Sequence, residues 1–306
     1  MQWNKKDIDG SLVRGLSERF GMDLLAASIL VRRGITDPES LRFFFEQDLR
    51  FLHMPFHFAE MEDAVERIEQ ARYQKERVFV FGDRDVDGIT SIVVLYHALT
   101  SIGLDTVWSL PTEDEPYGLT RKAVDDCLGQ GASLIITVDC GISNSEEVAY
   151  AAEQGVDVII LDHHNPQDRI PDAVAIINPK MEDSGYPFRD LSGCAVAYKV
   201  AWALRFARSE MYNHPICLMN IIPANDTFEI HAVKFMNLVE TDRIIENINP
   251  GMVTLEQTRL ARFLEGHEIY VYQAGTQIPM LRKLFGKQVL VQALDAAPEI
   301  WKEFPA

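Results

Sequence analysis

The sequence predicts an α/β fold in which a doubly wound parallel sheet is preceded by N-terminal helices and followed by a second, smaller α/β unit. From about residue 73 to residue 210, segments rich in Val, Ile and Phe alternate with segments whose apolar residues recur at helical spacing. Short connections that contain glycine join the two kinds of segment. Such alternation is typical of parallel strands covered by helices on both faces.

The individual elements of this region follow from the same two periodicities. Buried parallel strands are typically near-continuous apolar runs, and RVFVFG is the first of them. The expected strands are 78–82, 105–110, 133–138, 156–161 and 173–177. The expected helices are 89–102, 120–129, 144–154 and 192–208.

The regions on either side of this core have a different character. Residues 1–72 form a helical preface, in which Gly34 marks a helix end and Asp37 and Pro38 mark the next helix start. Beyond Tyr212 the chain becomes rich in strands, and we assign residues 211–306 to the second unit. No low-complexity linker separates the core from this unit.

Composition limits the classes of function that the chain can have. The 306 residues include 29 Lys and Arg against 46 Asp and Glu, a net charge of −17. This excess argues against a general basic surface for nucleic acid, so a nucleic-acid role needs a local basic groove, bound cations or another domain. The N-terminus lacks a signal-peptide pattern and no apolar run approaches a membrane span, which predicts a cytoplasmic protein without membrane contact.

Three aspartates at alternate positions follow the first predicted strand. Asp83, Asp85 and Asp87 stand in the stretch GDRDVDG, and so close together they must raise one another's pKa or bind a cation. A calcium loop is the first alternative, but an apolar helix follows the glycine and the glutamate that such a loop needs is absent. The loop therefore favours a different cation.

Polar residues also follow two further predicted strands. Asp139 stands in VDCGIS, and Asp162, His163 and His164 stand in LDHHN. Alone, Asp139 is more typical of a turn or helix cap, and the histidines could be a surface pair. Because ligands bind beyond the carboxyl ends of parallel strands, their joint placement favours one shared site.

Carboxylates and imidazoles without paired thiolates suit Mn²⁺ or Mg²⁺. No CxxC pair occurs among the four cysteines. Two such ions about 3.5–4 Å apart can activate a water molecule and stabilise the leaving oxygen of a phosphodiester. The pattern therefore predicts a hydrolytic phosphoesterase.

The motifs GDRDVDGITS, ITVDCGIS and ILDHHNP resemble successive motifs of the DHH phosphoesterase superfamily. The surrounding residues, roughly 10–208, resemble its RecJ-like branch of single-stranded-DNA-specific 5′→3′ exonucleases. The resemblance implies that two Mn²⁺ or Mg²⁺ ions are held by Asp83, Asp85, Asp139 and His163. Of these four ligands, Asp139 would bridge the two ions. It also implies that Asp162 orients a histidine and that His164 meets the scissile phosphate.

Three residues of the resemblance concern the substrate phosphate. Arg84 stands where the family usually has tyrosine, and could add a phosphate contact. Ser192 and Gly193 resemble a phosphate-facing turn, although Ser192 is equally readable as a helix N-cap.

The second unit resembles a DnaQ-like exonuclease domain without its acidic residues. FEIHAVKFMNLVETDRIIENINPGM resembles the early hairpin of that fold, and ICLMNII stands where its first two acids belong. We expect an inserted, catalytically inactive domain that binds a protein partner. The family's further metal-binding aspartate, in a motif close to GTVAD, is absent, and Asp226 is a conceivable substitute with different neighbours. The unit is therefore expected to be truncated and the chain to be a fragment.

The leading functional hypothesis is a single-stranded-DNA-specific 5′→3′ exonuclease of DNA repair and recombination, with weak activity as this fragment. One alternative is a phosphodiesterase acting on short oligonucleotides, cyclic dinucleotides or pyrophosphate. Relatives with that activity commonly place a histidine four residues before the first aspartate, where this chain has Phe79. The other alternative is a non-catalytic scaffold protein.

Overall fold

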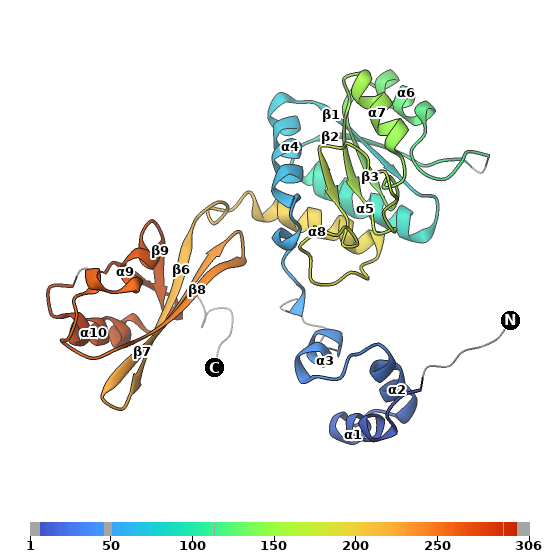
Figure 1. The fold of residues 1–306 in the computed structure, drawn as a ribbon. Helices are drawn as coiled ribbons and strands as arrows, with labels where there is room; N and C mark the ends of the chain where they lie inside the picture. The colour runs from blue at the N-terminus through green and yellow to red at the C-terminus, as the bar shows by residue number, and fades with distance from the viewer. Residues whose placement is uncertain (1–6, 46–50, 113, 290, 299–306) are drawn as a thin grey trace. The chain divides into compact units, whose positions relative to one another are not determined.

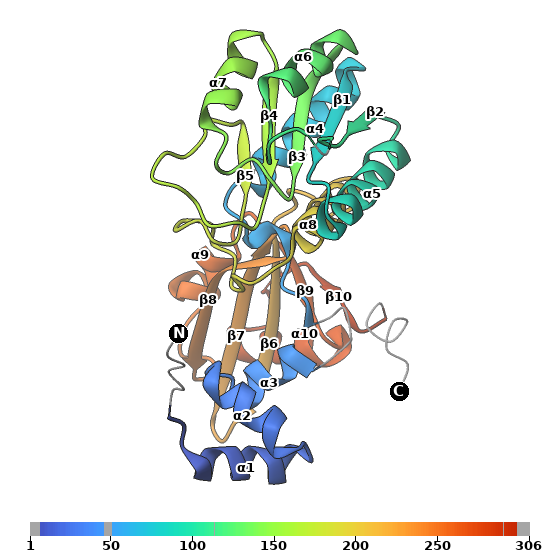
Figure 2. The same ribbon diagram turned by 90° about the vertical axis from the view of Figure 1, so that its right-hand side faces the viewer.

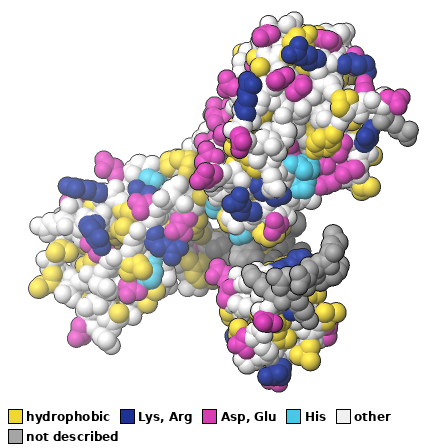
Figure 3. All heavy atoms as spheres, turned by 45° about the vertical axis from the view of Figure 1, so that its right-hand side comes forward, with side chains coloured by type: hydrophobic (Ala, Val, Ile, Leu, Met, Phe, Trp, Pro, Cys, Tyr) yellow, Lys and Arg dark blue, Asp and Glu magenta, His cyan; other side chains and the backbone are white. Residues whose placement is uncertain are grey.

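The computed structural model describes residues 7–45, 51–112, 114–289 and 291–298. The chain divides into two compact units, one up to residue 53 and one from residue 54 onward (Figure 1). No helix within the described ranges combines the length and apolar character that a membrane crossing needs. On the face drawn in Figure 3, Lys and Arg side chains are scattered among acidic ones rather than gathered in one basic area.

The first unit contains three helices: α1 (Gly10–Phe20), α2 (Leu24–Arg32) and α3 (Pro38–Phe45). Aspartate side chains accept backbone hydrogen bonds at their N-termini, as Asp37 does from the amide of Ser40 at 2.8 Å. The predicted helix start at Asp37 and Pro38 is confirmed. A small apolar core lies between the helices and contains Val13, Leu16, Ala27, Leu30 and Leu41.

The second unit begins with the short 3₁₀ helix η2 (Pro55–His57) and α4 (Met61–Gln74), and continues into a five-stranded sheet. The strands are β1 (Arg77–Gly82), β2 (Asp105–Ser109), β3 (Ala132–Val138), β4 (Asp157–Leu161) and β5 (Ala175–Ile177). Their order is β2-β1-β3-β4-β5, and all neighbours pair in parallel. The predicted doubly wound parallel sheet is confirmed.

Helices cover both faces of this sheet (Figure 1). The remaining helices of this region are α5 (Val86–Ser101), α6 (Arg121–Gly129), α7 (Ser145–Glu153) and α8 (Gly193–Phe206). Because side chains alternate along a strand, Val78 and Val80 pack with α4, α5 and α8, whereas Phe79 and Phe81 pack with α6 and α7. Both faces are therefore dry, as the apolar strand sequences predict.

Helix α4 is part of this layered core, although we expected the helical preface to extend to residue 72. Its apolar side chains, among them Met61, Ala64 and Ile68, are fully buried in the cluster that includes β1 and β3. Arg67, which is also buried on this helix, adds an ion-pair network: it hydrogen-bonds Glu76 at 2.8 Å and Asp157 at 2.6 Å. The structural division accordingly falls at residues 53 and 54.

A second sheet follows from residue 216, with strands β6 (Ile216–Ala224), β7 (Thr227–Met236), β8 (Val239–Ile248), β9 (Glu268–Val271) and β10 (Ala293–Asp295). Its order is β10-β9-β6-β7-β8 (Figure 2). Strands β6, β7 and β8 are antiparallel, whereas β9 pairs in parallel with β6 and with β10. The connections contain η3 (Leu255–Gln257), α9 (Arg259–Leu264) and α10 (Ala274–Phe285), whose apolar residues share one core with the sheet.

Candidate metal centre

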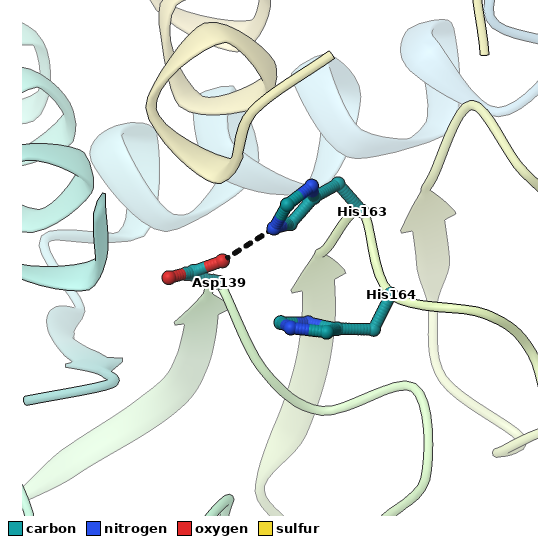
Figure 4. A group of neighbouring side chains, drawn as sticks. All are labelled: Asp139, His163 and His164. Carbon is teal, nitrogen blue, oxygen red and sulfur yellow. Dashed lines mark ion pairs between the residues drawn. The ribbon is translucent and has the colours of Figure 1, made fainter. Parts of the chain in front are cut away.

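The predicted site residues lie at the carboxyl ends of three neighbouring strands. Asp83 follows β1, Asp139 follows β3, and the run Asp162–His164 follows β4. Because β1, β3 and β4 are adjacent and parallel, these loops emerge at one edge of the sheet. Figure 4 shows Asp139 facing the two histidine rings from the next strand.

Two groups of potential metal ligands share one carboxylate. Asp83, Asp85 and Asp139 each place an oxygen so that all three atoms lie within 4.8 Å of one another. Asp139, His163 and His164 form a second group by the same measure. The structure thus brings together the four predicted metal ligands and adds His164, with Asp139 in the central position.

Asp139 is held in an environment that disfavours an uncompensated negative charge. Its side chain is 2% exposed, and its Oδ1 atom has no hydrogen-bond partner. Burial, and after it the nearby charges of Asp87 and Asp85, raise the pKa of Asp139 to about 7. Its backbone also has a φ of 58°, a left-handed conformation that is uncommon outside glycine. Such an arrangement fits a carboxylate whose charge is balanced by a cation.

The ring of His163 points its Nε2 atom at Asp139. Its Nδ1 atom lies 2.9 Å from the carbonyl oxygen of Leu191, which can only accept, so Nδ1 carries the proton. In the neutral ring the Nε2 atom is then an acceptor, and it lies 3.0 Å from Oδ1 of Asp139. Two acceptors at this distance repel each other unless a cation or proton lies at the site. The donor set therefore fits a metal ion, with the second ring nitrogen anchored as in many histidine ligands.

Asp162 hydrogen-bonds His164 and fixes the position of its ring. It is 1% exposed on its side chain, and its Oδ1 atom accepts from the backbone amide of His164 at 3.0 Å and from ring Nδ1 at 2.7 Å. Burial alone would raise the pKa of Asp162, but the hydrogen bonds from His164 and Ile142 lower it below the ordinary value. The same hydrogen bond raises the pKa of His164. As predicted, Asp162 contacts a histidine, and it leaves Nε2 of His164 directed away from the bond.

Asp87 has a role that we did not expect from the sequence. Its two carboxylate oxygens accept from the backbone amides of Gly193 and Cys194, each at 2.8 Å. These amides open α8, so Asp87 binds the N-terminus of that helix from the first turn of α5. The third aspartate of the alternating motif therefore joins two helices beside the metal ligands.

The predicted phosphate-facing turn forms the start of α8. Ser192 is its N-cap, with Oγ accepting from the amide of Ala195 at 3.2 Å. A Cβ atom on Gly193 would lie 2.5 Å from Oδ1 of Asp139, so this position needs glycine for close packing. Because the Gly193 amide donates to Asp87, a phosphate contact through that amide would require this hydrogen bond to break.

Arg84 connects the aspartate motif to the loop after β2. Its Nη1 atom donates to the carbonyl oxygen of Thr112 at 2.8 Å. That loop carries Tyr117, whose hydroxyl donates to the backbone oxygen of Asp139 at 3.0 Å and lies 3.2 Å from Nδ1 of His164. Arg84 therefore stabilises a loop that contacts two residues of the site. Its predicted contact with phosphate stays a prediction.

Replacing Arg84 with methionine should loosen the Tyr117 loop. The loss of one hydrogen bond is worth about 1 kcal/mol, so amide hydrogen exchange in residues 114–118 should increase about fivefold. Arg84→Lys, which keeps a donor, should show a smaller increase. Arg189→Met is a matched control, because it removes a similar bond to the Lys180 carbonyl oxygen in another loop. Equal exchange in Arg84→Met and wild type would contradict the proposed tether.

Comparison with known proteins finds similarity to one protein family over part of the chain. Residues 77–221 match the family model described as the DHH family, N-terminal domain. These residues therefore resemble the N-terminal domain of the DHH superfamily. The chain also resembles RecJ proteins: it is 40% identical over 205 residues to the single-stranded-DNA-specific exonuclease RecJ of Bacillus subtilis. It is also 40% identical over 147 residues to RecJ of Escherichia coli.

These alignments cover unequal shares of the proteins. The first covers 67% of this chain and the second 47%, but each covers 26% of the relative. Among solved structures, one described as exonuclease RecJ bound to manganese is 33% identical, with a TM-score of 0.43, and covers 48% of this chain and 38% of that one. RecJ in complex with Mn²⁺ from Thermus thermophilus is 27% identical, with a TM-score of 0.48, and covers 64% and 27%.

Asp226, considered as a substitute for the missing aspartate, lies in the turn between β6 and β7. It belongs to neither of the ligand groups found among the described residues.

Proposed function

We propose that this chain is the N-terminal part of a RecJ-type exonuclease that hydrolyses single-stranded DNA from the 5′ end with two Mn²⁺ or Mg²⁺ ions. The observation that carries the proposal is the position of Asp139, which belongs to both ligand groups and has a buried oxygen without a hydrogen bond. The names of the similar proteins, single-stranded-DNA-specific exonucleases, support the choice of substrate. The setting would be DNA repair and recombination in the cytoplasm.

Four side chains would hold the ions: Asp83, Asp85, Asp139 and His163. When bound, two such ions supply Lewis-acid stabilisation to the attacking and leaving oxygens of a phosphodiester. The chain's own contribution is positional. Leu191 fixes the His163 ring, and Asp162 fixes the His164 ring with its Nε2 atom available to the scissile phosphate.

Arg84 and the start of α8 are the proposed contacts to other substrate phosphates. Arg84, whose Nη1 atom donates to the carbonyl oxygen of Thr112, would bring its positive charge to a phosphate beside the aspartate motif. Ser192 would contribute its hydroxyl. Gly193 would contribute by allowing the helix to lie directly against Asp139.

The alternatives have less support. Phe79, at the position where oligonucleotide- and dinucleotide-cleaving relatives have histidine, is fully buried among apolar side chains and offers no ligand atom. A non-catalytic scaffold has no need for a buried carboxylate beside an acceptor nitrogen. The intact donor set therefore favours an enzyme.

The region of residues 211–306 is proposed to be an inactive DnaQ-like insertion that binds a partner protein. Its first strand, β6, contains no acidic residue. Alternate residues of β6, namely Cys217, Met219 and Ile221, enter the apolar core. The outward positions include Leu218 and Ile222, which are 42% and 41% exposed. This strand cannot supply carboxylates to a metal ion.

The proposal predicts that Asp139→Asn weakens Mn²⁺ binding more than tenfold. Loss of even supporting residues around a metal costs about 10–100-fold in affinity, and Asp139 serves both ligand groups. Titration calorimetry of the chain would measure the change. Asp172→Asn is a matched control, because Asp172 is exposed and belongs to neither group. Equal binding by wild type and Asp139→Asn would refute the assignment.

Hydrolysis should be measured on 5′-labelled and 3′-labelled single strands with Mn²⁺. We expect little activity from residues 1–306 and 5′-directed degradation when the sequence is extended to the length of the relatives. Asp139→Asn should abolish the activity of the longer protein. Robust degradation by residues 1–306 that His163→Ala abolishes would show that this chain already holds every ligand.

A further inference from the structure

A groove between α5 and α8 has the side chains of a nucleic-acid-binding surface. Its volume is about 570 Å³, and none of its lining residues is acidic. The absence of acidic residues from this lining is unusual for a chain with 46 acidic and 29 basic residues. The polar and aromatic lining residues are His97, Ser101, Tyr198, Trp202, Arg205 and Arg208.

Two aromatic rings are held in place in this groove. The rings of Tyr198 and Trp202 have centroids 6.2 Å apart and are tilted by 47°. The ammonium group of Lys199, a residue that is 2% exposed, lies 4.9 Å from the Trp202 centroid and 6.0 Å from that of Tyr198. Cation–π attraction from this buried side stabilises both rings, while Tyr198 remains 38% exposed.

The positive charges lie at the C-terminal end of α8. Arg205 is in its last turn and Arg208 is two residues beyond its end; both are exposed and both line the groove. Arg208 also lines a neighbouring hollow with Glu66 and Glu69, whereas Arg205 does not. Arg205 is therefore the clearer candidate for a contact with an external anion.

We propose that this α5–α8 groove binds a segment of single-stranded DNA outside the metal centre. Proteins that bind single strands combine arginine or lysine beside the phosphates with aromatic rings on which bases stack. The groove supplies both, and its freedom from carboxylates makes it complementary to a polyanion. The choice of DNA as the ligand rests on the function proposed above.

Helix α8 connects the metal centre to the groove. That helix begins at Gly193, next to Asp139, and Arg205 lies 12 residues further along. At 1.5 Å per residue, this is about 18 Å along the helix. A strand engaged at the metal centre can therefore extend along α8 to the groove, which would hold the part of the strand not being cleaved.

The test measures binding of a fluorescein-labelled oligothymidylate by fluorescence anisotropy, at low salt and with EDTA to prevent hydrolysis. Arg205→Glu should weaken binding about tenfold and reduce the dependence of affinity on salt by about 0.7 in the logarithmic slope. Trp202→Leu should weaken binding about tenfold through lost stacking. Arg282→Glu, an exposed arginine on α10, is the matched control and should bind as wild type does.

Mn²⁺ calorimetry on the same variants separates the two proposals. Arg205→Glu should bind Mn²⁺ as wild type does, which also shows that the core is folded. Unchanged DNA affinity in both groove variants would overturn the groove proposal. The same result is expected if the groove binds a protein instead of DNA. Wild type that binds DNA through the groove but binds no Mn²⁺ would overturn the proposed hydrolysis and leave the groove assignment standing.

Discussion

Replacing Arg67 with methionine is expected to lower the free energy of unfolding of the parallel-sheet core by about 3–5 kcal/mol. Arg67 is mostly buried, with 10% of its side chain exposed, and it bonds two carboxylates from different elements. Glu76, which also accepts from Ser133, is 15% exposed. Methionine would leave this carboxylate buried without its guanidinium partner, which is the costly way to break an ion pair.

Urea unfolding, monitored through the hydrogen exchange of the β1 and β3 amides, would measure this change in unfolding free energy specifically in the core. Arg72→Met is the matched control on the same helix. Arg72 bonds Glu69 at 2.6 Å, but 38% of its side chain is exposed, so its loss should cost less than about 1 kcal/mol. A similar small cost for Arg67→Met would show that the buried network contributes little.

The Arg67 effect should also depend on pH. Burial alone would raise the pKa of Glu76, but hydrogen bonds from Arg67 and Ser133 lower it below its ordinary value near 4.5. A lowered pKa in the folded state stabilises the protein above the unfolded value, and this stabilisation is lost as pH falls through the folded value. The difference between wild type and Arg67→Met should therefore narrow as the pH is lowered below about 4.5.

The second large effect is expected from Gly193→Ala. The new methyl carbon would lie 2.5 Å from Oδ1 of Asp139 and 2.8 Å from its Cβ atom, inside the normal contact distance. Either Asp139 or the start of α8 must move, and α8 is bound there by Asp87. We expect Mn²⁺ affinity to fall about 10–100-fold, the range found when a supporting contact of a metal ligand is lost.

Calorimetry with Mn²⁺ would measure the loss, and Gly129→Ala provides the control. Gly129 ends α6, and a Cβ atom there would meet no atom within 4 Å. Since alanine favours a helix over glycine, this substitution should leave metal affinity unchanged and stability equal or slightly higher. Wild-type affinity in Gly193→Ala would show that Asp139 tolerates displacement.

The core sheet could be predicted because each of its strands is marked by a pattern of neighbouring residues in the sequence. Strands buried on both faces are continuous apolar runs, such as RVFVFG before Asp83, and the polar residue that follows each run marks its carboxyl end. The predicted strand 133–138 and the observed β3 differ by one residue at one end. Adjacent parallel strands then necessarily bring Asp83, Asp139 and His163 together.

The contacts that were missed depend on tertiary structure. The apolar stripe of α4 shows that one face is buried, but not that β1 and β3 cover it. Asp87 meets the amide of Gly193 across 106 residues, and no spacing in the sequence encodes that meeting. Likewise, the path of the loop that brings the Tyr117 hydroxyl to Asp139 has no periodicity to reveal it.

The carboxylate of Asp87 occupies the place at a helix N-terminus where many proteins bind a phosphate group. It acts there as a tethered competitor, because attachment to the same chain gives it an effective concentration of about millimolar or higher. Free phosphate or sulfate at lower concentrations cannot displace it, so these two amides discriminate against dissolved anions. With the proposed function, substrate recognition at this edge of the sheet would consequently fall to bound cations and to the side chains around them.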